Sequence, residues 1–127
     1  MKQTIILLAS LFLISLYSTS CKKKSDDGYP KTVSIQYKIT PSAGISQTTS
    51  VVYMNESGAL TTLTNHALPF SKTISRTVSK GDALTLRGDA TGNGSLQLEI
   101  LVNNTVVKSA TPTGTSTITG QITYQFK

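Results

Sequence analysis

Apolar and polar residues alternate with a period of two along much of this chain, and no other feature constrains its fold as strongly. The first such run, residues 33–39, reads VSIQYKI, with Val33, Ile35, Tyr37 and Ile39 in one phase. A β-strand points successive side chains to opposite faces of a sheet. The run therefore predicts a strand with one buried face.

Similar runs recur to the end of the chain. Further strands are predicted at residues 50–54, 59–63, 70–79, 83–87, 96–102, 105–107 and 118–126. The segment 70–79 is assigned on Phe70, Ile74 and Val78, with Lys72 and Arg76 among its polar positions. Outside the first 20 residues no segment has a helical pattern, so the sequence indicates an all-β domain.

Turn-forming residues separate these runs. Turns are predicted at Asn55–Gly58 and Lys80–Asp82, and a loop with three glycines at residues 88–94, GDATGNG. Asn103 and Asn104 stand between two β runs, and because asparagine tolerates positive φ they predict a two-residue hairpin turn. Pro112 and Gly114 break the chain again, and Gly120 is a candidate bulge within the last strand.

Short strands separated by frequent turns are typical of a sandwich or a barrel. The pattern favours an immunoglobulin-like antiparallel β-sandwich of seven or eight strands, with a small closed barrel as the alternative. The 127 residues are enough for one ordinary domain. Because the predicted strands place three or four large apolar side chains on one face, the domain is expected to fold without disulfides.

Charge argues against a nucleic-acid partner. The formal charge is +6, but from Tyr29 onward eight basic and four acidic residues are scattered along the chain. A nucleic-acid-binding surface needs clustered basic residues with stacking aromatics. We therefore expect no nucleic acid among the partners.

The residues that could carry chemistry are few, and we expect no enzyme, cofactor or metal site. His66 is the only histidine and lies in a predicted loop or edge, where a surface or packing role is favoured. Asp82, Asp89 and Asn93 are interpreted as turn residues and Glu99 as solvent-exposed, although their oxygens could in principle bind calcium. Beyond the first 20 residues the aromatic residues fall mostly on apolar phases, which favours the core; they are Tyr29, Tyr37, Tyr53, Phe70, Tyr124 and Phe126.

The first 20 residues predict a signal peptide. Lys2 precedes the uncharged run IILLASLFLISL, residues 5–16, which is too short for a membrane span of about 20 residues. Small residues then lead to Cys21, the only cysteine, which cannot form an internal disulfide. The segment resembles a bacterial lipobox, although Ser18 stands where an aliphatic residue is usual. The resemblance implies cleavage before Cys21 and acylation of its thiol; an ordinary secretory signal or an uncleaved anchor is the alternative.

Residues 21–30 are interpreted as a lipidated tether and residues 31–127 as the β-sandwich domain. The tether is charged and ends in Gly28 and Pro30. Ser25-Asp26-Asp27 resembles the acidic signals that send some Bacteroidetes lipoproteins to the cell surface, while a plain solvated spacer explains it equally well. The expected location is the bacterial outer membrane, facing the periplasm or the cell surface.

A second resemblance covers roughly Val33 to the C-terminus, and Tyr37 is the first of the residues that carry it. It rests on Val51-Val52-Tyr53, Leu68-Pro69-Phe70-Ser71 and the late segment ILVNNTVV, residues 100–107. This order resembles the soluble domain of the mycobacterial membrane protein small (MmpS) family, with Asn103-Asn104 in place of an Asp-Gly turn. Leu68, Pro69 and Phe70 could contact a partner or pack at a strand entry. The family is usually anchored by a transmembrane helix and often has two cysteines in the domain; this chain has neither feature after Cys21.

The MmpS resemblance implies a membrane-held β-sandwich that assists a resistance-nodulation-division (RND) transporter. Together with the lipobox it suggests a lipid-anchored, non-catalytic binding or accessory protein of the cell envelope. The alternative is a surface-exposed module for a glycan or protein ligand. The expected partners are the membrane, through the lipid on Cys21, and an envelope protein such as an RND transporter.

Overall fold

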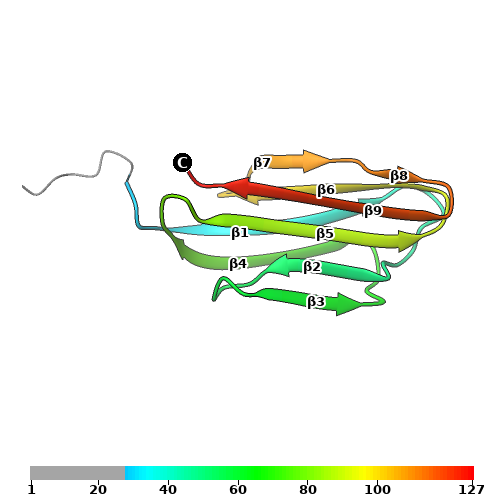
Figure 1. Cartoon of the computed structure of the whole chain (residues 1–127), viewed down its shortest axis with the longest axis horizontal. Coiled ribbons are helices and arrows are strands. Elements are labelled where there is room, and N and C mark those ends of the chain that lie inside the picture. Colours follow the sequence, from blue (N-terminus) through cyan, green and yellow to red (C-terminus); the bar gives the residue numbers. More distant parts are fainter. Residues whose placement is uncertain (1–27) are drawn as a thin grey trace, which may run out of the picture.

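Two antiparallel sheets packed face to face form the described part of the chain, residues 28–127 of the computed structural model (Figure 1). The predicted all-β antiparallel sandwich is confirmed. Cys21, the predicted signal peptide before it and Ser25-Asp26-Asp27 lie outside the described residues. Within residues 28–127, no helix combines the length and hydropathy that crossing a bilayer requires.

Nine strands make up the two sheets. They are β1 (Lys31–Pro41), β2 (Ser50–Met54), β3 (Leu60–Thr64), β4 (Phe70–Val78), β5 (Ala83–Thr91), β6 (Gly94–Val102), β7 (Thr105–Ala110), the two-residue β8 (Thr113–Gly114) and β9 (Thr117–Gln125). The first sheet has the order β4-β1-β6-β7, with β8 also paired to β6, and the second has the order β3-β2-β5-β9. The immunoglobulin constant-type order puts its first two strands in one sheet, whereas β1 and β2 lie in different sheets. The likeness to that class is therefore one of two-sheet architecture.

The centre of the second sheet differs from the sequence-based expectation. Residues 88–91 belong to β5 and are not loop, so the turn into β6 is short, at Gly92 and Asn93. Gly88 lies directly opposite Gly120 of β9, and the pairing of β5 with β9 runs without a register shift. The expected bulge at Gly120 is thus wrong; the irregularity lies in β6, between Ile100 and Leu101.

The predicted hairpin turns are confirmed. Asn103 and Asn104 have φ values of 49° and 66° and join β6 to β7, as a two-residue turn of positive φ requires. Between β2 and β3, the Oδ1 atom of Asn55 accepts hydrogen bonds from the backbone N–H groups of Ser57 at 3.0 Å and Ala59 at 3.2 Å. Gly58 has a φ of 83° in that turn.

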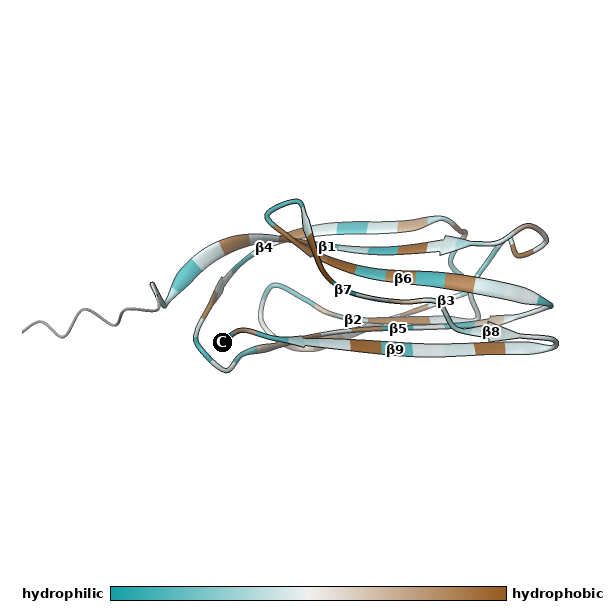
Figure 2. Ribbon diagram, turned by 90° about the horizontal axis from the view of Figure 1, so that it is seen from above, coloured by the Kyte–Doolittle hydropathy of each residue, from teal (hydrophilic) through white to brown (hydrophobic). Residues whose placement is uncertain are grey.

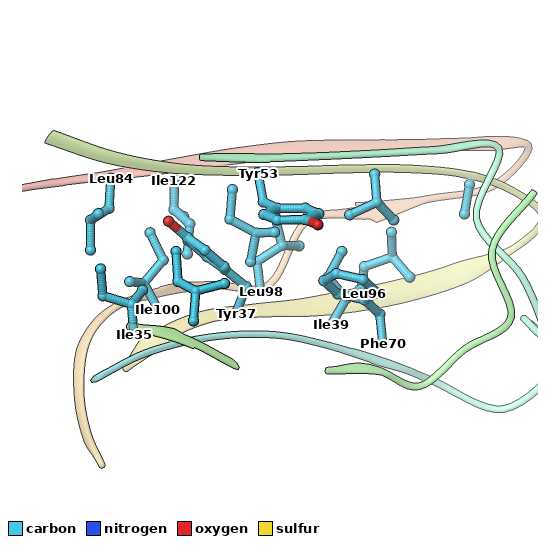
Figure 3. Packing of buried hydrophobic residues seen from close by; sticks show 14 of the residues in the cluster. Ile35, Tyr37, Ile39, Tyr53, Phe70, Leu84, Leu96, Leu98, Ile100 and Ile122 are labelled. Carbon is cyan, nitrogen blue, oxygen red and sulfur yellow. The ribbon is translucent and has the colours of Figure 1, made fainter. Parts of the chain in front are cut away.

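The core lies between the sheets. Figure 2 shows the two layers from above, with hydrophobic and hydrophilic bands alternating along β6 and β9. Figure 3 shows the side chains of the two sheets meeting between the ribbons. The buried apolar residues are Val33, Ile35, Tyr37, Ile39, Ile45, Val51, Tyr53, Phe70, Ile74, Val78, Leu84, Leu86, Ala90, Leu96, Leu98, Ile100, Ile118, Ile122 and Phe126. The alternation that predicted the strands therefore also predicted which face is buried.

The start of β1 and the C-terminus lie at the same end of the sandwich, which we call the tether end (Figure 1). Tyr29, placed in the tether by the sequence analysis, packs edge-on against Phe126 with ring centroids 6.3 Å apart. The ammonium group of Lys31 lies 4.4 Å from the centre of the Tyr29 ring. The backbone N–H of Phe126 donates to the carbonyl of Asp82 at 2.9 Å. Tyr29, within the predicted tether, thus packs against the domain.

Candidate functional site

The four edge strands are the parts of this sandwich most open to pairing with another chain, and they differ in how they are covered. On one side, β9 packs against β6, β7 and β8 of the opposite sheet. The crossover from β7 to β9 covers that side, since Pro112 lies against Gly120. The carbonyl of Pro112 accepts a hydrogen bond from the N–H of Leu96 at 3.0 Å. On the other side, the edges are β4 and β3 (Figure 1).

The edge strand β4 places charged residues in its inward phase. Lys72 and Arg76 alternate with the buried Phe70, Ile74 and Val78 along one face. Inward-pointing charges on an edge strand discourage pairing with another chain. Arg76 is held in place: its Nη1 atom lies 3.2 Å from the Sδ atom of Met54, and its Nη2 atom lies 3.6 Å from the Oδ2 atom of Asp82.

The edge strand β3 carries no charge and pairs only with β2 in the described chain. The N–H of Asn55 donates to the carbonyl of Ala59 at 2.8 Å, and the N–H of Asn65 donates to the carbonyl of Thr49 at 3.3 Å. Because hydrogen-bonded pairs alternate in an antiparallel ladder, Thr61 and Leu63 also bond toward β2.

The backbone groups of Leu60, Thr62 and Thr64 consequently point away from β2, and we call these three residues the open edge. Leu60 is 59% exposed. Two large hydrophobic residues are exposed in the described chain, and Leu60 is the more exposed of them. Thr62 and Thr64 are exposed as well. Within residues 28–127, the open edge thus offers unpaired donors and acceptors beside an exposed apolar side chain.

A row of aromatic rings leads from the core to this side of the molecule. The Tyr37 and Tyr53 centroids are 5.5 Å apart, those of Tyr53 and Phe70 5.9 Å, and those of Phe70 and His66 5.1 Å. His66 is half-buried just after β3, and its Nδ1 atom lies 2.7 Å from the carbonyl oxygen of Ala67. These contacts give His66 a packing role, which supports the interpretation made from its position in the sequence.

The Leu68-Pro69-Phe70 segment divides between core and surface. Phe70 is buried and Leu68 is half-buried against the core, while Pro69 is exposed. The N–H of Leu68 donates to the carbonyl of Ser46 at 2.9 Å, which fixes the segment to the loop before β2. Packing at the entry to β4 therefore accounts for Leu68 and Phe70.

The polar residues considered as ligands are dispersed. The Oδ2 atom of Asp82 accepts a hydrogen bond from the N–H of Ser79 at 2.9 Å, as expected of a turn residue. Asp89 is in β5, where its Oδ2 atom lies 2.9 Å from the Nε atom of Arg87, so the turn prediction for Asp89 is wrong. Glu99 is only 17% exposed in its side chain and pairs with Lys38 at 3.7 Å, so its predicted exposure is also wrong. No group of three or more potential metal ligands, and no pocket, occurs among residues 28–127.

Tyr37 is the one buried side chain of the described residues whose polar atom has no hydrogen-bond partner there. An unpaired buried hydroxyl destabilises the folded state, so Tyr37→Phe is expected to raise the free energy of unfolding by about 1 kcal/mol at neutral pH. Burial also raises the pKa of the Tyr37 hydroxyl above its ordinary value of 10.0, with Arg76 partly opposing the shift.

The raised pKa predicts the direction of alkaline destabilisation. Above pH 10 the unfolded chain releases the Tyr37 proton while the folded chain retains it, so stability falls by up to about 1.4 kcal/mol per pH unit. Urea unfolding between pH 8 and pH 11.5 should show a shallower alkaline loss for Tyr37→Phe than for the wild type. Equal alkaline slopes would show that Tyr37 ionises as readily in the folded chain.

Sequence reasoning did not identify the open edge. Lys72 and Arg76 lie on the same face of their strand as Phe70 and Ile74. Charged residues on the inward face of a strand indicate an edge strand, so the sequence did contain a signal that β4 is an edge. The edge position of β3 depends on the order of strands in the sheet, which a single sequence does not contain. Cys21 lies outside the described residues, so the structure leaves it as a sequence-based prediction.

A comparison of the chain with known protein families and with curated proteins finds no match.

Proposed function

We propose that this protein is a lipid-anchored, non-catalytic protein of the bacterial envelope whose sandwich binds a protein partner at the side formed by β3 and β4. The observation that carries the binding role is the open edge, where an uncharged strand presents unpaired backbone groups and the exposed Leu60. Unpaired strand edges are a recurrent site of protein recognition.

The position of the tether end supports an anchored arrangement. Six residues separate Cys21 from Gly28, and an extended chain spans at most about 3.6 Å per residue. An acylated Cys21 would therefore keep the tether end within about 25 Å of the lipid surface. The β3 edge runs along the side of the sandwich and leads away from that end, so anchoring leaves it accessible.

The resemblance to the MmpS domain favours an RND transporter as the partner. The lipobox-like segment before Cys21 and the Ser25-Asp26-Asp27 sequence favour the outer membrane as the site of anchoring. Crosslinking in intact cells should then join the domain to an envelope transport protein. If such crosslinking recovered no envelope protein, the accessory role would be contradicted.

The anchor is tested by metabolic labelling with a fatty-acid analogue. The wild type is expected to incorporate the label, and Cys21→Ala is expected to lose it completely because the acylated thiol is absent. Ser20→Ala is the matched control: it changes the neighbouring residue, retains the thiol and should keep the label. Label on Cys21→Ala would refute acylation at this position.

A further inference from the structure

We propose that β3 accepts an extended, acidic segment of the protein partner as an added strand of the second sheet. The inference rests on the proposed binding function and names the class of partner segment. Three features of the described residues carry it: the direction of the β3 backbone groups, the contrast between β3 and the other edges, and the charge beside it.

The backbone of the open edge is arranged for strand addition. Leu60, Thr62 and Thr64 direct their N–H and C=O groups away from β2, as the alternation of the β2–β3 ladder requires. A partner strand laid along β3 would bond to these groups and cover Leu60. Residues 60–64, LTTLT, contain no charge or proline, the residues by which exposed edges commonly block such pairing.

The positive charge of Lys72 favours an acidic residue in the added strand. Lys72 lies on the same inward face of β4 as Phe70 and Ile74, yet its side chain is exposed. We infer that the side chain extends out from between the sheets on the side of the open edge. Phe70 packs against His66 beyond one end of β3, and Arg76 contacts Met54 near the other. Lys72 therefore lies alongside the middle of β3 and faces the inward side chains of an added strand.

The charge of Lys72 is not balanced within the domain. Lys72 forms no hydrogen bond or ion pair with any residue of the range 28–127, whereas Arg76 pairs with Asp82. Glu56 lies in the β2–β3 turn, at the opposite end of β3 from His66. An acidic residue at an inward position of the partner strand would meet Lys72 and pair with it.

The same charge argues against a second copy of this chain as the occupant. Two β3 strands could pair about a two-fold axis at Thr62, since the open edge would then face itself. That arrangement brings Lys72 of both copies to the same open side of a continuous sheet. Like charges at close range oppose it, whereas an acidic strand removes the conflict.

The test uses the full chain purified from membranes in detergent and two capped peptides, VTVDVTV and VTVKVTV, which differ only in the central residue. Amide hydrogen exchange is followed residue by residue by NMR. The aspartate peptide is expected to slow exchange at Leu60, Thr62 and Thr64, while Thr61 and Leu63 are already protected by β2. It should bind about five-fold more tightly than the lysine peptide, the size of effect expected of one exposed ion pair.

Variants separate the backbone and charge contributions. Thr62→Pro removes an N–H that points away from β2 and should abolish peptide-induced protection, while Thr62→Val keeps that N–H and should bind as the wild type does. Unchanged exchange at Leu98 verifies that Thr62→Pro remains folded. Lys72→Glu should reverse the preference, so that the lysine peptide binds more tightly.

The outcomes decide between occupants. Absence of peptide-induced protection at the open edge would overturn strand addition, and equal binding of the two peptides would overturn the acidic preference. Protection that rises with protein concentration in the absence of peptide would identify a second copy as the occupant and contradict the proposal. Fatty-acid labelling of Cys21 does not depend on β3, so failure of strand addition and failure of the anchor are distinguishable.

Discussion

Replacing Leu98 by alanine is expected to lower the free energy of unfolding by about 3 kcal/mol, the largest stability effect that we predict for a single substitution. Leu98 is fully buried in β6, opposite Ile39 of β1, and its side chain meets the second sheet (Figure 3). Removing it leaves a cavity between two sheets whose strands are fixed by their ladders and cannot close around it.

Leu60→Ala is the matched control for Leu98→Ala. It deletes the same atoms from a leucine that is 59% exposed, and it should change stability by less than about 0.5 kcal/mol. Urea unfolding followed by circular dichroism measures both variants. Equal losses for the two would contradict the assignment of Leu98 to the core and of Leu60 to the surface.

Gly120→Ala is expected to cost about 2 kcal/mol, because the new methyl group would overlap a rigid neighbour. A Cβ atom at Gly120 would meet the Pro112 ring, which lies in the crossover from β7 to β9. Pro112 cannot withdraw freely, since its carbonyl accepts a hydrogen bond from Leu96. The substitution should therefore push the crossover away from β9.

Gly88→Ala provides the comparison, because Gly88 lies directly opposite Gly120 in the ladder. A Cβ atom there would come 2.9 Å from the Cδ1 atom of Ile39, the far end of a side chain that can turn. We expect a cost below about 1 kcal/mol for Gly88→Ala and partial recovery of Gly120→Ala in combination with Pro112→Ala. Equal costs for the two glycine variants would contradict this account of the packing.

The sequence predicted the strands best where local pattern and tertiary environment agree. The limits of β2 match the prediction, because an apolar run between polar turns is also a central strand of its sheet. The Asn103-Asn104 hairpin was predictable because its turn chemistry is local. Alternation in β1 and β6 likewise identified the buried face, since both strands have one face against the core.

The errors arose where a distant strand overrides local preference. Gly88 and Asp89 were assigned to a loop on their intrinsic turn preference, but pairing with Gly120 and Thr119 of β9 holds them in a strand. The packing of Tyr29 on Phe126 joins residues far apart in the sequence and had no local signal. The open edge was missed for the same reason, because only the strand order shows that β3 lacks a second neighbour.

The central structural claim is that the open edge of β3 is unpaired, and amide hydrogen exchange of the full chain without added peptide tests it most directly. An unpaired edge should give an alternating pattern, with fast exchange at Leu60, Thr62 and Thr64 and slow exchange at Thr61 and Leu63. Slow exchange at all five positions would show that a neighbouring strand already covers the edge. Fast exchange at all five would show that β3 is not held by β2; either result would contradict the account.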